Sequence, residues 1–451
     1  MLTRDEALNV LEMAIRCSSA DQTEVMLHGS EHGLTRLANG SIHQNVHITN
    51  LSAHVRAVVG KRVGVATSNR LSGDGLRALV ERAVAVAKVS EPNAEFDSLP
   101  GPGEYVFSAG TLASPVPDID EDAFSPTGRA DAALTIINTA RGNGATAFGH
   151  VSTDVSMLAV GNSLGVRAHH AWTACSVMAI ATLGDASGYA QWSGQSLVGA
   201  PTGGTAAHAV SKCLAAEAAG MVEPGRYTVI LEPPAVAEML GMLAYMGLGA
   251  TQYQEGRSFL SGKLGENLVG ENITLRDDTY HPLSIPLPFD FEGVPRRVVP
   301  FFESGVAKGV VYDSYTARKE GRESTGHALP APNTYGPIPL HLVLEGGAQT
   351  REELIACVER GILVTRFHYV NIVHPTEAII TGMTRDGTFL IEDGAVTKAV
   401  NKLRFTQSIL EALSRVSGLE RALTLVSGEG MHCVVPALRI EDFNFTSASP
   451  E

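Results

Sequence analysis

The sequence predicts an α+β fold: an N-terminal α/β part with a meander sheet and helices, then a mostly antiparallel, barrel-like β part with a buried helix. Apolar residues recur at helical spacing over residues 3–20 and 72–90. Between these helices, residues 24–64 alternate in the manner of strands and are interrupted by glycines. After residue 223, short apolar runs separated by glycine turns favour an antiparallel sheet or barrel.

Local start and turn signals support the elements expected in the first half. Thr3 is a candidate N-cap for the first helix, with Asp5 and Glu6 in its first turn. The pair Asn39-Gly40 predicts a tight hairpin. The elements expected next are an irregular connection over 91–125, a helix over 126–142, strands between 145 and 184, and a helix over 204–220.

The dipeptide Pro224-Gly225 marks the expected domain boundary, which divides the chain into residues 1–222 and 223–451. After a strand at 227–231, Pro233-Pro234 begins a helix that is apolar almost all round, and such a helix is buried. The final elements expected are a helix over 404–417 and a strand over 434–445.

Composition limits the classes of function. The 451 residues carry a net charge of −14, with 44% hydrophobic and 18% charged residues. Such a chain folds into a core, and its acidity argues against binding nucleic acid. We find no apolar run of about 18 residues that would span a membrane, and no signal-type N-terminus. The five cysteines are widely spaced, which favours reduced thiols in the cytoplasm.

Several histidine patterns resemble metal sites without the required geometry. The segment 28–32, His-Gly-Ser-Glu-His, matches the H-x-x-E-H zinc-peptidase pattern, which requires a helix. Its glycines disrupt a helix, so we expect a polar loop between strands. His43 and His47 share a face of a strand, where such positions are about 13 Å apart, too far to share one ion. His54 and the pair His169-His170 are likewise expected to be surface residues.

Other candidate catalytic groups are isolated. Glu238 is the only acidic or basic residue of the helix after Pro233, and one carboxylate cannot hold a catalytic zinc ion. We expect it to be a hydrogen-bonded residue of a buried helix. Cys433 follows His432, but catalytic pairs are matched in space rather than in sequence. No G-x-S-x-G elbow is present, and the acidic residues between 277 and 313 are best explained as turn caps.

The second half contains five segments of distinctive sequence: EGRSFLSGKLGE (255–266), ITLRDD (273–278), DFEGVP (290–295), GVAKGVVYDSYTARKEG (305–321) and STGHALP (324–330). Their order and spacing carry a resemblance to the TldD/PmbA family, also labelled modulators of DNA gyrase. It extends over nearly the whole chain. The stretch 367–387, with His368, His374 and Met383, departs from the better-known members.

The resemblance is to the PmbA (TldE) branch, which lacks the H-E-x-x-x-H zinc motif; residues 233–240 contain no histidine where the motif would lie. It implies a non-catalytic subunit with no cofactor of its own. The chain would pair with a zinc-bearing TldD-like subunit in a cytoplasmic protease for unfolded or ribosomally made peptides. Glu238 and Cys433 are the candidate relic or alternative site. DNA binding is not expected.

We expect the substrate channel to include polar residues from glycine-flanked turns, namely Arg257, Ser258, Lys263, Ser324 and Thr325. An equally favoured alternative is that these residues only cap the turns. Two other functions stay open at this point. One is a stand-alone metallopeptidase with a scattered site, to which His374, His432, Cys433 or Glu238 would contribute. The other is a homodimeric peptide-binding scaffold. The sequence identifies neither the peptide nor the partner.

Overall fold

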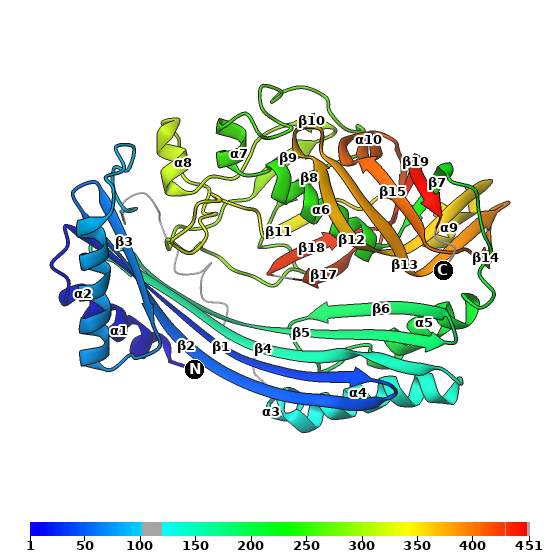
Figure 1. Ribbon diagram of the computed structural model, residues 1–451, viewed down its shortest axis with the longest axis horizontal. Helices are drawn as coiled ribbons and strands as arrows, with labels where there is room; N and C mark the ends of the chain where they lie inside the picture. Colours follow the sequence, from blue (N-terminus) through cyan, green and yellow to red (C-terminus); the bar gives the residue numbers. More distant parts are fainter. Residues whose placement is uncertain (102–119, 429, 449–451) are drawn as a thin grey trace.

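A long curved sheet forms the N-terminal half, and the C-terminal half lies over one of its faces (Figure 1). The computed structural model describes residues 1–101, 120–428 and 430–448. The sheet has the order β3-β2-β1-β4-β5-β6, and each neighbouring pair is antiparallel. Its strands are β1 (Gln22–Ala38), β2 (Ser41–Val59), β3 (Arg62–Ser68), β4 (Thr146–Asn162), β5 (Arg167–Leu183) and β6 (Ala186–Gly194).

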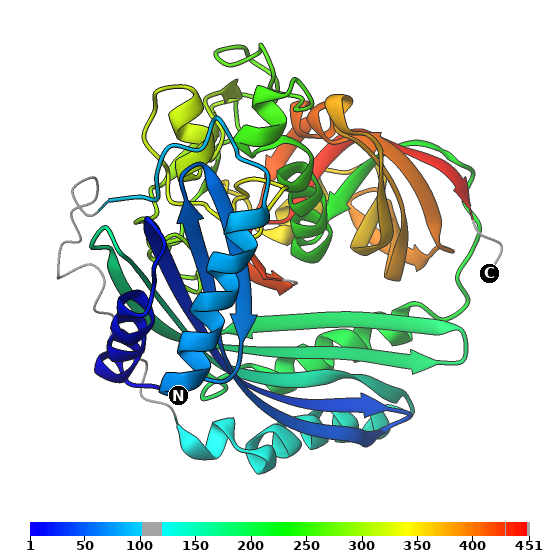
Figure 2. The same ribbon diagram turned by 60° about the vertical axis from the view of Figure 1, so that its left-hand side comes forward.

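The two faces of this sheet have different partners because side chains alternate along a strand. Odd-numbered residues such as Val25 and Leu27 pack against helices, which cover one face of the sheet (Figure 2). Even-numbered residues such as Met26 and Leu158 pack against Phe289 of the C-terminal half. The helices are α1 (Arg4–Arg16), α2 (Gly73–Val89), α3 (Glu121–Phe124), α4 (Pro126–Gly142) and α5 (Thr202–Ala215).

Local signals in the N-terminal half produce the expected elements. Thr3 and Glu6 form a capping box at the start of α1. Asn39 and Gly40 have φ angles of 52° and 68° and close the β1–β2 hairpin, as an Asn-Gly turn of this kind requires. The apolar residues that recur at helical spacing over 72–90 form the buried face of α2, which consists of Leu76, Leu79, Val80, Ala83, Val84 and Ala87. The irregular connection expected over 91–125 lies partly outside the described residues.

A closed barrel forms part of the C-terminal half, as the sequence predicts. Its strands follow the order β12-β7-β19-β15-β13, and β12 pairs with β13 to close the ring. Those strands are β7 (Gly225–Leu231), β12 (Arg360–His374), β13 (Ile379–Glu392), β15 (Leu403–Ser408) and β19 (Leu438–Ala448), with β14 (Ala395–Ala399) and β16 (Val416–Leu419) paired outside the ring.

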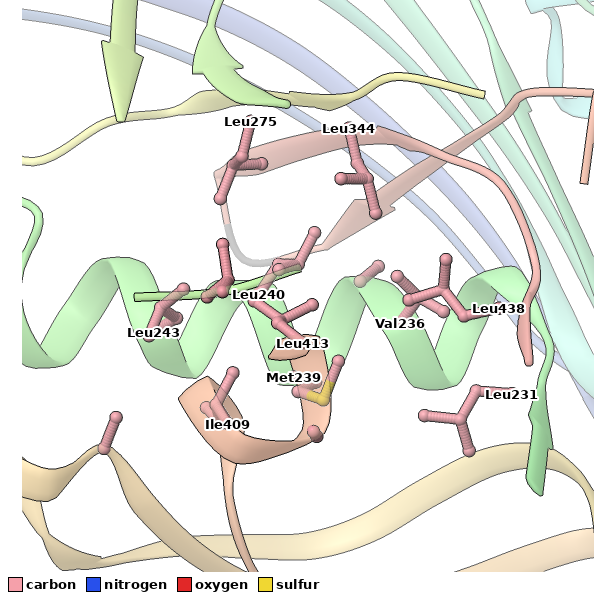
Figure 3. Close-up of a cluster of buried hydrophobic side chains, with 14 of the residues drawn as sticks. Leu231, Val236, Met239, Leu240, Leu243, Leu275, Leu344, Ile409, Leu413 and Leu438 are labelled. Carbon is pink, nitrogen blue, oxygen red and sulfur yellow. The ribbon is translucent and has the colours of Figure 1, made fainter. Parts of the chain in front are cut away.

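A second sheet of the C-terminal half has the order β10-β9-β8-β11-β18-β17. Its strands are β8 (Leu275–Asp277), β9 (Val299–Glu303), β10 (Val306–Ala307), β11 (His341–Leu344), β17 (Thr424–Gly428) and β18 (Met431–Val435). Helix α6 (Pro233–Gly247) lies in the core shared by this sheet and the barrel, where Leu240 is near Leu275 and Met239 is near Ile409 (Figure 3). The short helices are α7 (Ala250–Gln254), α8 (Ser314–Lys319), α9 (Arg351–Ala356) and α10 (Ile409–Ser414).

Three local predictions were wrong. The segment 28–32 is not a loop but the middle of β1, which pairs on both sides there. The helix expected over 404–417 is divided between β15 and α10, because β15 pairs with β13 and β19 and this pairing overrides local helix propensity. The last strand is interrupted at Pro436, which lies between β18 and β19.

The domain boundary at 222/223 stays a prediction, although the chain leaves the first sheet between α5 and β7. Among the described residues, no helix is both long enough and apolar enough to cross a membrane.

Gly64 allows α2 to approach β3 closely, and an alanine there should destabilise the protein. A Cβ atom at Gly64 would lie 2.2 Å from the Ala87 nitrogen and 2.3 Å from the Ala83 oxygen, both backbone atoms. We expect Gly64→Ala to lower the free energy of unfolding by about 1–3 kcal/mol, the usual cost of overpacking. Urea denaturation measures the change. Gly142→Ala is the matched control, because a Cβ there meets nothing within 4 Å; equal stability of the two variants would contradict the prediction.

Candidate functional site

Helix α6 contains residues 233–240, where the zinc motif would lie in the zinc-bearing branch of the family that the sequence resembles. The helix has two unlike faces. Most of its side chains are buried in the core, as expected from its apolar sequence. Glu238 and Tyr245, however, are exposed, and their spacing of seven residues places them on one stripe of the helix, which we call the open stripe. Tyr245 stacks on Tyr335 with 4.8 Å between the ring centroids. Glu238 is thus an exposed residue on a helix that is otherwise largely buried.

Glu238 lies close to residues of both halves. Burial raises the pKa of Tyr189 on β6 to about 12, and the carboxylates of Asp386 and Glu238 act in the same direction. The guanidinium of Arg366 lies 4.5 Å from the centre of the Tyr189 ring and donates a 2.8 Å hydrogen bond to Asp386. The Glu238 carboxylate is therefore close enough to Tyr189, on the edge strand of the N-terminal sheet, to affect the pKa of that residue.

Cys433 lies behind α6 rather than on its open stripe. It is 4% exposed, and its Sγ lies 4.0 Å from the carbonyl oxygen of Ala237. Burial, together with the nearby carboxylates of Asp277 and Glu238, raises the pKa of the Cys433 thiol to about 12. A thiol with such a pKa stays protonated at neutral pH, so it is a poor nucleophile.

The donor atoms around α6 do not fit a zinc ion. A catalytic zinc site in a protein has three protein ligands, with imidazole nitrogens prominent among them. Here α6 offers one exposed carboxylate, and the nearby thiol is buried and protonated. Within the part of the chain that the structure describes, no group of three or more His, Cys, Asp and Glu side chains is placed to hold a metal ion.

Several buried polar side chains on or near β8, β11 and β18 contact one another. His327 Nε2 lies 3.0 Å from Asp277 Oδ1, and Asp277 Oδ2 accepts hydrogen bonds from the backbone N–H groups of Leu340 and His341. The rings of His341 and His432 are 5.3 Å apart. His432, considered as a metal ligand from the sequence, instead lies 2.9 Å from the hydroxyl of Ser427.

Two of the acidic residues between 277 and 313, Asp290 and Asp313, cap a turn and a helix, as expected, whereas Glu292 pairs with Arg56. Asp290 accepts hydrogen bonds from the backbone N–H groups of Glu292, Val294 and Ala328. Asp313 is the N-cap of α8 and takes part in a capping box. These carboxylates therefore support the fold directly.

The five residues expected in a substrate channel are not brought together as one group of exposed side chains. Arg257 and Lys263 are exposed, and Arg257 pairs with Glu255 at 2.5 Å. The segment that follows α7 lies on the side of the C-terminal half away from the N-terminal sheet (Figure 1).

The three hydroxyl residues of this group cap turns. Ser258 donates to the carbonyl of Gly247 at 2.6 Å, Ser324 donates to that of Tyr312 at 3.2 Å, and Thr325 accepts from the backbone N–H of Tyr312 at 2.7 Å. Their part in a channel stays a prediction. His374 is exposed at the end of β12, where its Nδ1 lies 3.2 Å from the hydroxyl of Thr376.

Sequence patterns alone did not reveal a group of histidines on the sheet face that is turned toward the C-terminal half. His28 and His32 on β1, His54 on β2 and His150 on β4 are all even-numbered, and the even-numbered face is the one turned toward the C-terminal half. His32 Nδ1 lies 2.6 Å from Asp154 Oδ1. The sequence shows the alternation within each strand, but the register between distant strands was needed to find this group.

His170, expected at the surface, is 3% exposed at the contact between the halves. Its Nε2 lies 3.0 Å from the carbonyl oxygen of Pro286. Burial lowers the pKa of His170 to about 4, and burial has the same effect on His432. Both side chains are therefore neutral in the folded protein at neutral pH.

Acid should destabilise this protein through these two histidines. An unfolded histidine binds a proton near pH 6.5, whereas each folded one resists protonation down to about pH 4. Stability is therefore complete above pH 6.5 and falls between pH 6.5 and 4, by about 1.4 kcal/mol per pH unit for each group. The free energy of unfolding, measured by urea denaturation at several pH values in this range, should fall less steeply with decreasing pH in His170→Gln than in wild type. The exposed His208→Gln is the control, and an unchanged slope in His170→Gln would refute this account.

Comparisons with known proteins place the chain in a family. Residues 224–447 match the model of the PmbA/TldA metallopeptidase C-terminal domain, and residues 23–87 match that of PmbA/TldA metallopeptidase domain 1. The crystal structure of TldE from Thermococcus kodakarensis has the same fold, with a TM-score of 0.86 at 24% identity, covering 98% of this chain and 100% of that one.

Curated relatives match over shorter stretches. A metalloprotease of Methanothermobacter thermautotrophicus is 27% identical over 203 residues, which is 43% of each chain. A metalloprotease TldD homolog of Haemophilus influenzae is 25% identical over 209 residues, 44% of this chain and 43% of the relative. The alignments thus span less than half the length of these relatives. Taken with the two domain models and the shared fold, they show that this chain belongs to the TldD/PmbA family.

Proposed function

We propose that this chain is the non-catalytic, TldE-like subunit of a heterodimeric TldD-type zinc metalloprotease that acts on unfolded or ribosomally made peptides. The observation that carries the proposal is the composition of α6. Its open stripe presents Glu238 and Tyr245 but no imidazole, and the thiol of Cys433 behind it is protonated. Under this proposal the zinc ion and the water that it activates belong to the partner subunit.

The buried frame around α6 is compatible with a structural role in such a complex. Asp277, Asp290 and His327 come from segments that carry the family resemblance, and each is fully buried and hydrogen-bonded. A subunit that keeps this frame without zinc ligands keeps its shape while lacking the metal chemistry. It would serve by completing an enclosed, water-poor chamber around a peptide.

An exposed strand edge offers a surface for the partner. β3 pairs with β2 only from Ala53 onward, so among the described residues Ser41–Leu51 pairs on one side alone, with β1. This stretch contains no charged residue and no proline, the features that usually protect such an edge. Ile48 is 54% exposed there. We propose that the zinc-bearing subunit covers this edge.

Reconstitution with a zinc-bearing family member tests the function. The purified chain alone should contain less than about 0.1 zinc per chain and should not cleave an unfolded peptide. Mixed with a partner that carries H-E-x-x-x-H, it should form a heterodimer whose peptide hydrolysis exceeds that of either component. Zinc content is measured by mass spectrometry and cleavage by chromatography. Stoichiometric zinc and cleavage by this chain alone would instead establish a stand-alone metallopeptidase, and a homodimer that never exchanges would establish a scaffold.

A charge on the exposed edge should weaken that heterodimer. We expect Ile48→Lys to raise the dissociation constant at least tenfold, because the edge backbone and its apolar side chains would have to bury an ammonium group against the partner. Val89→Lys is the matched control, since Val89 is 82% exposed at the end of α2. Analytical ultracentrifugation of both variants with the partner gives the constants. Equal affinity of both variants would place the interface elsewhere.

A further inference from the structure

A cavity of about 490 Å³ lies where the two halves meet, at a distance in the fold from the open stripe of α6. Its walls come from β2, β3 and the segment 93–98 of the N-terminal half, and from Glu292, the start of α8 and residues 328–334 of the C-terminal half. Cavities of several hundred cubic ångströms hold small organic ligands. None of the residues discussed for zinc or for the peptide channel lines it.

The inner end of this cavity is acidic. Arg56 donates hydrogen bonds to Glu24 at 2.8 Å and to Glu292 at 2.9 Å. Glu292 and Asp313 are adjacent carboxylates that line the cavity, and Arg56 and Arg318 are the basic residues of its lining. Burial, and then the negative charge of Glu292, raises the pKa of Asp313. Both causes disfavour the charged carboxylate, and a cation bound beside it would stabilise that charged form.

Two polar atoms at the same end have no partner. Ser314 is 4% exposed and lines the cavity, and its Oγ is buried without a hydrogen-bond partner among the described residues. The Nε of Arg56 is also buried without a hydrogen-bond partner among the described residues. Buried polar groups are nearly always hydrogen-bonded, so each of these atoms has unused hydrogen-bonding capacity that a ligand or a water molecule would satisfy. The hydroxyl can accept a hydrogen bond, whereas the guanidinium can only donate one.

The remaining walls are largely apolar. They are formed by Val63, Val65, Phe96, Leu329 and Pro332. Such a wall suits a hydrocarbon side chain, which gains from leaving water. The cavity therefore combines an acceptor-rich acidic end and an apolar wall within a single small volume.

We propose that this cavity binds the free amino end of a peptide, or an amino acid amide, that carries an apolar first side chain. The ammonium group would lie against Glu292, Asp313 and Ser314. The first carbonyl would accept from Arg56, and the side chain would pack on the apolar wall. This site would hold a ligand by its amino end without cleaving it. The inference goes beyond the proposed function and does not depend on zinc or on a partner.

Calorimetric titration of the full chain tests the site with L-leucinamide as the probe. We expect saturable binding with one site per chain. N-acetyl-L-leucinamide, which lacks the positive charge, should bind at least tenfold more weakly. Isoamylamine, which lacks the carbonyl, should also bind more weakly than leucinamide. A hexapeptide amide that begins with leucine distinguishes the sources: binding at least equal to that of leucinamide indicates a peptide end, and weaker binding indicates a free amino acid amide.

Substitutions locate the binding. Asp313→Asn removes the charge but keeps a good N-cap for α8, and it should weaken leucinamide binding at least tenfold. Ser314→Ala, which leaves the carboxylates intact, should weaken it a few-fold. Asp120→Asn, at the exposed N-cap of α3, is the matched control and should bind as wild type does. Circular dichroism confirms that each variant is folded.

Three results would overturn the proposal: no binding of leucinamide, equal binding of its acetylated form, or unchanged binding in both Asp313→Asn and Ser314→Ala. Because the titration uses this chain alone, its failure is distinct from a failure of reconstituted peptide cleavage.

Discussion

Buried carboxylates that accept hydrogen bonds from the backbone hold the C-terminal half together. Asp277 binds the start of β11, and Asp290 binds its own turn and the distant Ala328. The segments between β8 and β9, and between α8 and β11, contain almost no regular structure and have few ladder hydrogen bonds of their own. A buried N–H group without a partner is costly, so loops of this kind depend on side-chain acceptors.

This dependence explains why the segments that carry the family resemblance need not be catalytic. Asp277 and His327, which come from two of those segments, are in direct contact 50 residues apart in sequence. Their burial makes them part of the scaffold around α6. The buried side of α6, with Leu240 and Leu243, belongs to the core that supports the fold, whereas Glu238 lies on its exposed side. The side chains on the exposed side of α6 are therefore not needed for packing of this core.

The contact between the halves combines apolar packing with charge. Phe289 and Leu287 pack on the inner face of the N-terminal sheet, while Arg56 joins Glu24 of that sheet to Glu292 of the C-terminal half. Buried ion pairs are weak sources of stability but specific in geometry. Here Arg56 links the two halves through Glu24 and Glu292, and the cavity beside it has walls from both halves.

The sequence by itself determined what depends on neighbouring residues. Helical periodicity identified the buried face of α2, Asn39-Gly40 identified the first hairpin, and the composition of 233–240 showed that no histidine is present. These features need only a few consecutive residues, since capping, turn geometry and helix periodicity act over one or two turns.

Only the tertiary structure decided what depends on pairing between distant segments. It placed residues 404–408 in the barrel, exposed Glu238, gathered four histidines on one sheet face and buried His170. Strand register and the side of α6 left uncovered are set by partners far away in the chain. The physical reason is that burial belongs to the assembled core, and a residue's own neighbours in sequence do not specify it.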